Sequence, residues 1–309
     1  MARAVELAER GRGTTHPNPL VGAVVVSPGG GSIVGEGWHE RAGEPHAEVH
    51  ALRAAGERAR DATLYVTLAP CSRHGRTPPC VDAIVAAGIA KVVIGVDDPS
   101  QNGVARLREA GVEVEVADDW EPRVLTEAWR WWVEHRRPFV TYKVAATLDG
   151  RVAIPGERWV SGEPARRYVH ELRARSDAVA VGMGTVRADD PRLDARDVDV
   201  MRPPRTLAFG LGPLPKTSRL ELRSGALEEE LRALGEEDVQ SLLLEGGPTL
   251  ATAFLERDLI DKLLVFVAPR LAGVGPRLLG DFVPPRRLCH VTVRQVGDDV
   301  LFEAYLHGP

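Results

Sequence analysis

The first third of the chain alternates short apolar runs with segments of helical periodicity. Strand-like runs occur at residues 21–26, 32–38, 62–68, 91–96 and 112–116, and helices are expected at 2–10, from 46, around 81–87 and at 104–111. Strands that alternate with helices predict a mostly parallel sheet that is covered on both faces. The amphipathic segment 121–138 then predicts one helix, and we interpret its three tryptophans as packing residues rather than a cofactor site.

The same pattern begins again after Pro138. Apolar runs at 139–150, 177–182, 205–210, 239–245 and 261–269 alternate with helical segments at 164–175 and 249–258, and 298–306 resembles an edge or hairpin strand. We therefore expect an α/β protein with domains at 1–118 and 138–309 and a connecting helix at 119–137.

Composition narrows the class of protein. The 309 residues are 44% hydrophobic and 27% charged, which is typical of a soluble globular enzyme. The net charge of −5 argues against a nucleic-acid-binding surface. A charged N-terminus and the lack of any run of about 18 apolar residues argue against a signal peptide and a membrane span. Three cysteines do not form a disulfide framework, so we expect a reducing compartment, the cytoplasm.

The candidate chemistry is concentrated in two short stretches. His46 and Glu48 are separated by one alanine at an expected helix start, and Cys71 and Cys80 follow in "LAPCSRHGRTPPC". One imidazole and two thiolates would bind zinc and leave a fourth position open, as catalytic zinc sites do. Zinc lowers the pKa of a water in that position, and Glu48 could carry protons between this water and a substrate, the logic of zinc deaminases.

Two alternatives stay open for this cluster. His46 and His50 are spaced i,i+4, as in H-E-x-x-H proteases, but in that motif glutamate directly follows the first histidine, whereas Ala47 does here. The cluster could also be a non-catalytic zinc clasp, although such clasps usually have four protein ligands. We therefore expect His46, Cys71 and Cys80 to bind the metal and His50 to lie on a helix face.

Three segments resemble the deaminase domain of the bifunctional riboflavin-biosynthesis deaminase/reductase family over about residues 1–115: "THPNPLVGAVVV", "GEGWHERAGEPHAEVHAL" and "YVTLAPCSRHGRTPPC". The eight residues between the cysteines distinguish this family from cytidine and tRNA adenosine deaminases. The resemblance implies a cytidine-deaminase-like three-layer α/β fold. It also implies that Asn18 and His39 contact the pyrimidine and that Arg76 contacts the phosphate or ribityl side. From the residues alone, "HPNP" is equally consistent with a turn in which Asn18 bonds its own backbone.

The chain departs from the family pattern at two places in this domain. Arg73 stands where the family usually has a second histidine. The loop after Pro99, "SQNGVARL", is shorter than the family's glycine-rich loop, which normally helps to hold the substrate phosphate. Substrate affinity or selectivity in the first reaction is therefore expected to differ.

In the second domain, "SLLLEGGPTLA" places two glycines and Pro248 between an apolar strand that ends at Glu245 and a helix. The N–H groups of such a helix start can cradle a phosphate, although a tight strand–helix turn is the more common explanation. The pair Asp189-Asp190 before a proline is likewise typical of a capped turn.

Together with "KVAATLDGRVA", "GERWVSGEPARR" and "GTVRADDPRL", this stretch resembles the reductase domain of the same family over roughly residues 138–306. The resemblance implies a dihydrofolate-reductase-like fold that uses NADPH, with Lys143 at the end of the first strand assisting proton transfer. Phe209-Gly210 departs from the family, which more often has an aspartate there. The stretch between 205–210 and 239–245 is shorter than the family norm, so one strand–helix segment of the family is expected to be missing. The residues implied to hold the substrate phosphate are Arg173, Leu193, Arg196 and Glu245. Those implied to line the NADPH site are Ala145, Trp159, Thr185, Asp189, Gly247, Pro248, Thr249, Leu250 and Ala251.

The function implied is zinc-dependent deamination of 2,5-diamino-6-(5-phosphoribosylamino)pyrimidin-4-one, followed by NADPH-dependent reduction of its ribosyl group to ribityl. The expected partner is this small molecule, with no nucleic acid or membrane, in a homodimer or higher homo-oligomer. One alternative is a monofunctional deaminase whose degenerate second domain is a scaffold. A nucleic-acid deaminase is disfavoured by the acidic balance and the lack of a basic aromatic face.

Overall fold

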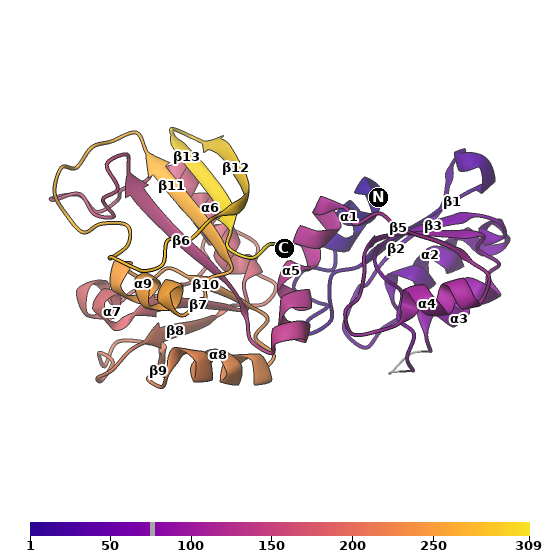
Figure 1. Cartoon of the computed structure of the whole chain (residues 1–309), viewed down its shortest axis with the longest axis horizontal. Coiled ribbons are helices and arrows are strands. Elements are labelled where there is room, and N and C mark those ends of the chain that lie inside the picture. The colour runs from indigo at the N-terminus through magenta and orange to yellow at the C-terminus, as the bar shows by residue number, and fades with distance from the viewer. Residues whose placement is uncertain (75–77) are drawn as a thin grey trace. The chain divides into compact units, whose positions relative to one another are not determined.

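The computed structural model describes residues 1–74 and 78–309, and the chain divides into two compact units, Met1–His135 and Arg136–Pro309 (Figure 1). Each unit has its own sheet. The order of strands is β2-β1-β3-β4-β5 in the first and β12-β13-β11-β6-β10-β7-β8-β9 in the second. The prediction of two α/β domains is therefore confirmed. Among the helices in the described part of the chain, none is long and apolar enough to cross a bilayer.

The first unit closely follows the predicted order of elements. Its helices are α1 (Ala2–Glu9), α2 (Ala47–Ala55), α3 (Cys80–Ala86), α4 (Gly103–Glu109) and α5 (Trp120–His135), with 3₁₀ turns η1 (Pro28–Gly30) and η2 (Gly56–Ala59). Its strands are β1 (Gly22–Val26), β2 (Ile33–Trp38), β3 (Thr63–Leu68), β4 (Lys91–Val96) and β5 (Glu113–Val116).

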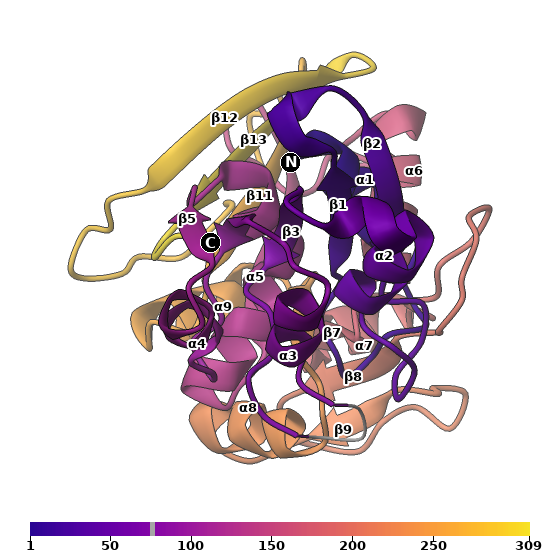
Figure 2. The same cartoon turned by 90° about the vertical axis from the view of Figure 1, so that its right-hand side faces the viewer.

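Alternation along β1 gives the first sheet two apolar faces. Ala23 and Val25 pack in one core with residues of α2, α3 and α4, whereas Val24 packs in another with residues of α1. Figure 2 shows α2, α3 and α4 on the near side of this unit. Helix α5 packs on β3 and β4, where Gly95 leaves room for Pro122. The result is a three-layer arrangement with helices on both faces.

The prediction of a mostly parallel sheet is wrong for one half of the first unit. Strands β3, β4 and β5 are parallel, but β1 is antiparallel to both β2 and β3. The reason is the short connection between β1 and β2, which closes through the bond from Ser27 N–H to the Ser32 carbonyl at 2.9 Å. Such a connection allows only a hairpin, because parallel neighbours need a long crossover.

Two glycines of β2 let helix α2 approach the sheet closely. A Cβ atom added at Gly35 would lie 2.1 Å from the Ala51 carbonyl oxygen, and one at Gly37 would lie 2.4 Å from that of Ala47. At these distances the added Cβ atom would overlap the carbonyl oxygen, so neither position can carry a side chain. The small residues on both sides therefore fix where the N-terminus of α2 lies, and this end of the helix begins directly after His46.

The second unit contains more elements than predicted. Its helices are α6 (Glu163–Arg175), α7 (Met183–Asp189), α8 (Leu227–Glu236) and α9 (Pro248–Glu256). Its strands are β6 (Phe139–Thr147), β7 (Ala178–Gly182), β8 (Arg205–Phe209), β9 (Glu221–Arg223), β10 (Ser241–Leu244), β11 (Lys262–Ala268), β12 (Cys289–Val296) and β13 (Asp299–Tyr305). The stretch between the runs 205–210 and 239–245, in which the sequence pattern located no element, holds β9 and α8. Strand β13 forms the predicted hairpin but lies inside the sheet, and the edge strand of the sheet is β12.

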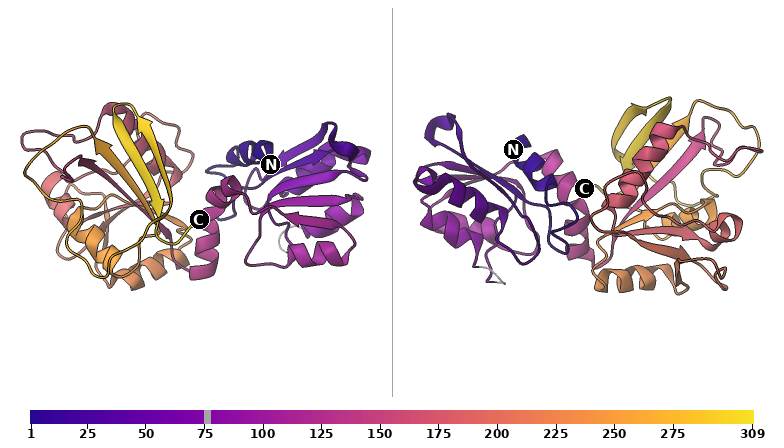
Figure 3. Two further views of the ribbon diagram at one scale, coloured as in Figure 1. Left: turned by 45° about the horizontal axis from the view of Figure 1, so that its top comes forward. Right: turned by 180° about the vertical axis from the view of Figure 1, so that it is seen from behind.

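Both faces of the second sheet are covered. Leu242 and Leu244 of β10 pack in the core that includes α8 and α9, whereas Leu243 packs on the opposite side with Val179 and Val181 of β7. Helix α6 covers that second side, and the views in Figures 1 and 3 show both faces. Strands β11, β6, β10, β7, β8 and β9 run parallel. Their C-terminal ends therefore meet at one edge, where ligand sites of such sheets lie.

Candidate active sites

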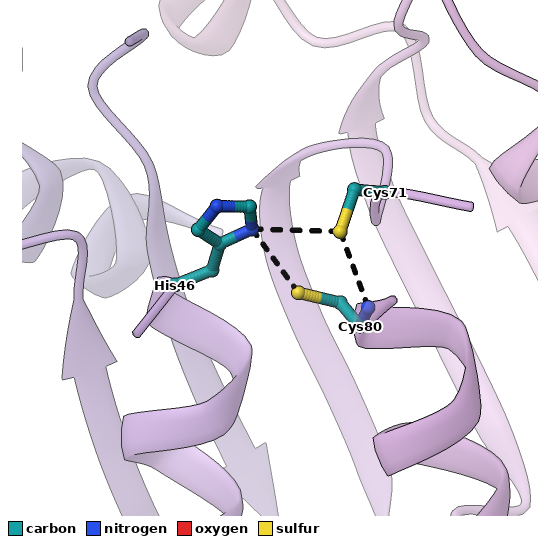
Figure 4. A group of neighbouring side chains, drawn as sticks. All are labelled: His46, Cys71 and Cys80. Atoms are coloured by element: carbon teal, nitrogen blue, oxygen red, sulfur yellow. Dashed lines mark hydrogen bonds between the residues drawn. The ribbon is translucent and has the colours of Figure 1, made fainter. Parts of the chain in front are cut away.

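In the first unit, three side chains from separate elements converge. His46 is the N-cap residue of α2, Cys71 follows β3, and Cys80 is the first residue of α3. His46 Nδ1 lies 3.5 Å from Cys71 Sγ and 3.3 Å from Cys80 Sγ (Figure 4). Within residues 1–74 and 78–309, these three form the only group of His, Cys, Asp and Glu side chains placed to hold a metal. His50 does not belong to it.

The spacing of these donor atoms fits zinc. Zinc–sulfur bonds of about 2.3 Å and zinc–nitrogen bonds of about 2.0 Å at tetrahedral angles place nitrogen and sulfur about 3.5 Å apart. The three donor atoms lie within 4.8 Å of one another, so one ion could bind all three without rearrangement. Three protein ligands leave one tetrahedral position for water or substrate, which is the composition of a catalytic site.

The electrostatics of the cluster prepare it for a cation. A hydrogen bond from the Cys80 thiol, assisted by His46, lowers the pKa of Cys71 to about 4 in spite of burial. The same hydrogen bond, with burial and the charge of Glu48, raises the pKa of Cys80. The backbone N–H of Cys80 also donates to Cys71 Sγ at 3.2 Å. The lowered pKa favours the thiolate form of Cys71, which is the form in which cysteine binds metal.

Glu48 lies beside this cluster as a buried acid with one unpaired carboxyl oxygen. It is in the first turn of α2, is 3% exposed, and lines the same cavity as His46 and Cys71. Burial raises the pKa of its carboxyl group. Its Oε2 atom has no hydrogen-bond partner in the described part of the chain. A raised pKa makes a carboxylate a better proton acceptor, which suits general acid–base catalysis.

Asn18 and His39 form a hydrogen-bonded chain on another wall of the cavity. His39 is 2% exposed, its Nδ1 lies 3.2 Å from the Pro45 carbonyl oxygen, and its Nε2 lies 3.0 Å from Asn18 Nδ2. Because a carbonyl can only accept, Nδ1 carries the proton and Nε2 accepts from Asn18. Burial lowers the pKa of His39, so the ring is neutral. Asn18 therefore presents its oxygen, an acceptor, on its other side.

The cavity that these residues line has a volume of about 150 Å³. Asn18, His39, His46, Glu48 and Cys71 line it as a group, while Cys80 lies outside the lining and Arg76 lies outside the described residues. The sequence did not indicate three further lining residues, Asp98, Gln101 and Trp129. Trp129 could have been found from the spacing of α5, since it shares a helix face with the buried Pro122 and Thr126.

In the second unit, a buried group of charges lies at the centre of a larger cavity of about 650 Å³. Arg173 of α6 binds both oxygens of Glu245, with Nε at 2.6 Å and Nη2 at 3.0 Å, and Lys143 Nζ lies 4.0 Å from Glu245 Oε2. Lys143 is in the middle of β6, not at its end as predicted.

Burial opposes ionisation of both Lys143 and Glu245, and the pKa of each group is lowered, for different reasons. It lowers the pKa of Lys143, and the charge of Arg173 adds to this effect. Burial opposes ionisation of Glu245 too, but the charge of Lys143 and the bonds from Arg173 outweigh it, so the pKa of Glu245 is lowered. Glu245 is therefore a carboxylate, and Lys143 releases its proton more easily than an exposed lysine does.

Most of the predicted residues of the second domain lie together around this cavity. Ala145, Trp159, Thr185, Asp189, Leu193, Arg196, Gly247 and Pro248 line it together with Lys143, Arg173 and Glu245. Three predicted residues do not. Ala251 is fully buried in the core, Leu250 packs against that core, and Thr249 is exposed. Only the start of α9 borders the cavity, because one helical turn carries the following residues away from it.

The structure adds His170 to the lining of this cavity. Its Nδ1 accepts the backbone N–H of Arg196 at 3.2 Å, so a neutral ring carries its proton on Nε2. The signal in the sequence was its position three residues before Arg173 on α6. Trp159 is held between two cations, since the guanidinium carbons of Arg158 and Arg166 lie 5.0 and 5.3 Å from its ring centre.

Each half of the chain matches one protein-family model. Residues 138–302 match the family model of the RibD C-terminal domain. Residues 1–96 match that of the cytidine and deoxycytidylate deaminase zinc-binding region.

Similar proteins cover the whole chain. The riboflavin biosynthesis protein RibD of Escherichia coli (strain K12) is 39% identical, over 97% of this chain and 96% of the relative. RibD of Aquifex aeolicus (strain VF5) is 40% identical, over 89% of this chain and 87% of the relative.

Two solved structures have the same fold over both units. Acinetobacter baumannii RibD, form 2, has a TM-score of 0.84 at 35% identity, covering 98% of this chain and 97% of its own. The diaminohydroxyphosphoribosylaminopyrimidine deaminase/5-amino-6-(5-phosphoribosylamino)uracil reductase of Thermotoga maritima has a TM-score of 0.85 at 36% identity, covering 99% and 97%.

Proposed function

Because this chain belongs to the RibD family, it is a riboflavin-biosynthesis enzyme with a deaminase half and a reductase half, and we propose which residues carry each reaction. It acts on a small-molecule pyrimidine, and zinc and NADPH are its cofactors. We propose that it deaminates diaminohydroxyphosphoribosylaminopyrimidine and then reduces 5-amino-6-(5-phosphoribosylamino)uracil, the substrates in the name of the Thermotoga maritima relative.

In the first reaction, His46, Cys71 and Cys80 would hold zinc, which would supply an activated water as the nucleophile. Glu48 would carry one proton of this water to the ring nitrogen and the other to the departing amine, which leaves as ammonia. The buried Oε2 atom of Glu48 supports this role, since this oxygen has no hydrogen-bond partner among the described residues. Asn18 accepts from a donor on the pyrimidine, in an orientation that His39 fixes.

In the second reaction, the bound NADPH would be the source of the hydride that reduces the ring-opened ribosyl group, which reacts as an imine. The addition also needs one proton, and Lys143 is placed to give it, because burial lowers the pKa of its amine. Glu245 holds Arg173 in place, and Arg173 and Arg196 bind the substrate phosphate, for which guanidinium groups are well suited. The N-terminus of α9, at Gly247 and Pro248, receives a phosphate of the cofactor.

The convergence of three zinc donors beside a cavity that a buried glutamate also lines is the observation that carries this proposal. For the second half, the intact Lys143–Glu245–Arg173 group in a large cavity favours a working reductase over a scaffold. We propose residues 1–118 and 138–309 as the limits of the two catalytic domains, and we propose a cytoplasmic homodimer or larger homo-oligomer that binds no nucleic acid.

The test is to supply purified protein with the phosphoribosylamino-pyrimidine and to measure zinc content, ammonia release and NADPH consumption together. We expect one zinc per chain, ammonia release without NADPH, and NADPH consumption that follows ammonia release. Ammonia release without any NADPH consumption, even with the deaminated substrate added directly, would establish the scaffold alternative. Turnover by metal-free protein would contradict the role of the three ligands.

A further inference from the structure

The shortened loop after β4 is tied to the backbone that follows a zinc ligand. Gln101 Oε1 accepts the backbone N–H of Ser72 at 2.8 Å and that of Arg73 at 3.3 Å. These two residues come directly after Cys71. The amide of Gln101 thus fixes the position of the chain at the point where it leaves the metal cluster.

The same loop also holds the other polar groups of Ser72. The backbone N–H of Asn102 donates to Ser72 Oγ at 3.3 Å, and Arg106 Nη1 donates to the Ser72 carbonyl oxygen at 2.7 Å. Ser72 is 8% exposed. Its N–H, hydroxyl and carbonyl groups therefore all bind one segment, residues 101–106. A neighbour of a metal ligand that is held at every polar group is typical of the shell that orients a metal site.

The hydrogen bonds of Gln101 also fix which way its amide points. Since Oε1 accepts two backbone donors, Nε2 is the atom that donates to Asp98 Oδ2, at 3.2 Å. Asp98 is 4% exposed, and its Oδ1 accepts both the N–H of Ser100 at 2.8 Å and its hydroxyl at 2.6 Å. The second hydrogen on Gln101 Nε2 has no partner among residues 1–74 and 78–309. Gln101 and Asp98 both line the cavity, so this hydrogen is available to a ligand there.

The charges around the cavity decide which ligand group this hydrogen can meet. The described lining residues include two acids, Glu48 and Asp98, and neither lysine nor arginine. Among these residues a phosphate dianion would have no cationic partner, and burial of a charge without one is costly. An uncharged acceptor, such as a ring nitrogen or a carbonyl oxygen of the pyrimidine, has no such penalty.

We propose that Gln101 both positions the Cys71–Arg73 backbone and donates a hydrogen bond to an uncharged acceptor of the pyrimidine ring. In this chain, the loop of residues 98–102 therefore recognises the base rather than the phosphate. This inference rests on the deaminase function proposed above, and it names a specificity-determining residue for that reaction.

A cycle of two variants and two substrates tests the recognition of the base. Gln101→Glu keeps an acceptor for Ser72 and Arg73 but has no hydrogen for a ligand, because any proton on its carboxyl group would be shared with Asp98 Oδ2, which lies 3.2 Å from this position. We expect its KM for deamination to rise about three- to tenfold, the size of one neutral hydrogen bond, while kcat stays within about twofold. The factor should be equal for the phosphorylated substrate and its dephosphorylated nucleoside, because independent contacts are additive. Gln295→Glu, on exposed β12, is the matched control and should leave both KM values unchanged.

Zinc release tests the positioning role without any use of activity. Gln101→Met has a similar size but neither donor nor acceptor, and we expect it to lose zinc to a chelator about tenfold faster than wild type or Gln101→Glu. Folding of each variant is checked by circular dichroism, and Gln101→Glu remains informative if Gln101→Met does not fold.

Three results would overturn the inference. An unchanged KM in Gln101→Glu removes the donor role, and a rise in KM that vanishes with the nucleoside assigns Gln101 to the phosphate. Zinc release from Gln101→Met at the wild-type rate removes the positioning role. If wild-type protein holds zinc but releases no ammonia, the deaminase proposal itself fails, whereas the zinc-release comparison still decides whether Gln101 positions the ligand loop.

Discussion

The two cavities of this enzyme are built in opposite ways. In the first, the ligands His46 and Cys71 and two acids line a space of about 150 Å³, with the third ligand directly beside it. In the second, residues from β6, α6, α7, the start of α9 and several loops surround about 650 Å³, and one carboxylate lies between two cations. A compact site concentrates its chemistry in a few atoms. A wide site distributes binding over many contacts, so single changes should have graded effects there.

Replacement of Glu48 by glutamine should give the largest effect and the clearest difference between the two activities. The amide cannot take up a proton, so we expect ammonia release to fall about 10³-fold, the size of lost general acid–base catalysis. Zinc content and NADPH-dependent reduction of the deaminated substrate should stay at wild-type levels. Retention of wild-type ammonia release would show that another group carries the proton. It would contradict the proposal that this one acid carries out the proton transfer.

The corresponding test of the second cavity is the substitution Glu245→Ala. It leaves Lys143 and Arg173 without their shared partner and misplaces both, so we expect NADPH consumption to fall about 10²-fold, as small displacements of catalytic groups do. Ammonia release is the internal control and should be unaffected. A simultaneous loss of both activities would contradict the independence of the two sites and would indicate misfolding, which circular dichroism would detect.

The same carboxylate should also contribute to stability in a pH-dependent way. The pKa of Glu245 is lowered in the folded protein, so its contribution is present above the ordinary glutamate pKa and is lost as the pH falls through the folded value. We expect Glu245→Gln to cost about 2 kcal/mol of unfolding free energy at pH 7, as charged hydrogen bonds do. Urea unfolding should show this difference shrinking below about pH 4, and a difference that is independent of pH would contradict it.

The smallest expected effect concerns Trp129, which brings α5 into the first site. Trp129→Ala should raise the KM for ammonia release about three- to tenfold through loss of an aromatic wall, whereas Trp129→Phe should stay within about twofold. Initial rates over a range of substrate concentrations give both values. Equal KM values for Trp129→Ala and wild type would limit α5 to packing, the role that the sequence suggested for its tryptophans.

The compact first site could be predicted from the sequence more completely than the wide second site. The zinc donors lie on short motifs next to element ends, so spacing and chemistry were enough to bring His46, Cys71 and Cys80 together. Gln101 was not predictable, because its role depends on the backbone of Ser72, 29 residues earlier in the chain. Apolar periodicity gave two α/β units, but it could not separate the antiparallel β1 from parallel neighbours, because pairing direction depends on connection length.

In the second unit, strand periodicity located β6 and β10 but not the sites along them. Lys143 lies in the middle of its strand, and the three-residue strand β9 is too short to give an alternating pattern. Family resemblance extended the cofactor site to Ala251, whereas helical geometry buries that residue in the core. Motifs therefore predict which residues gather around a site, and the geometry of each helix decides which of them remain at its surface.

The glycines of β2 have a consequence for how this enzyme can change. Since Gly35 and Gly37 leave no space between the strand and α2, neither position tolerates even a methyl group without displacing the helix that begins after His46. Engineering the deaminase for larger bases would therefore have to proceed from the opposite walls, at Asp98 or Trp129, while the β2 side stays closed to redesign.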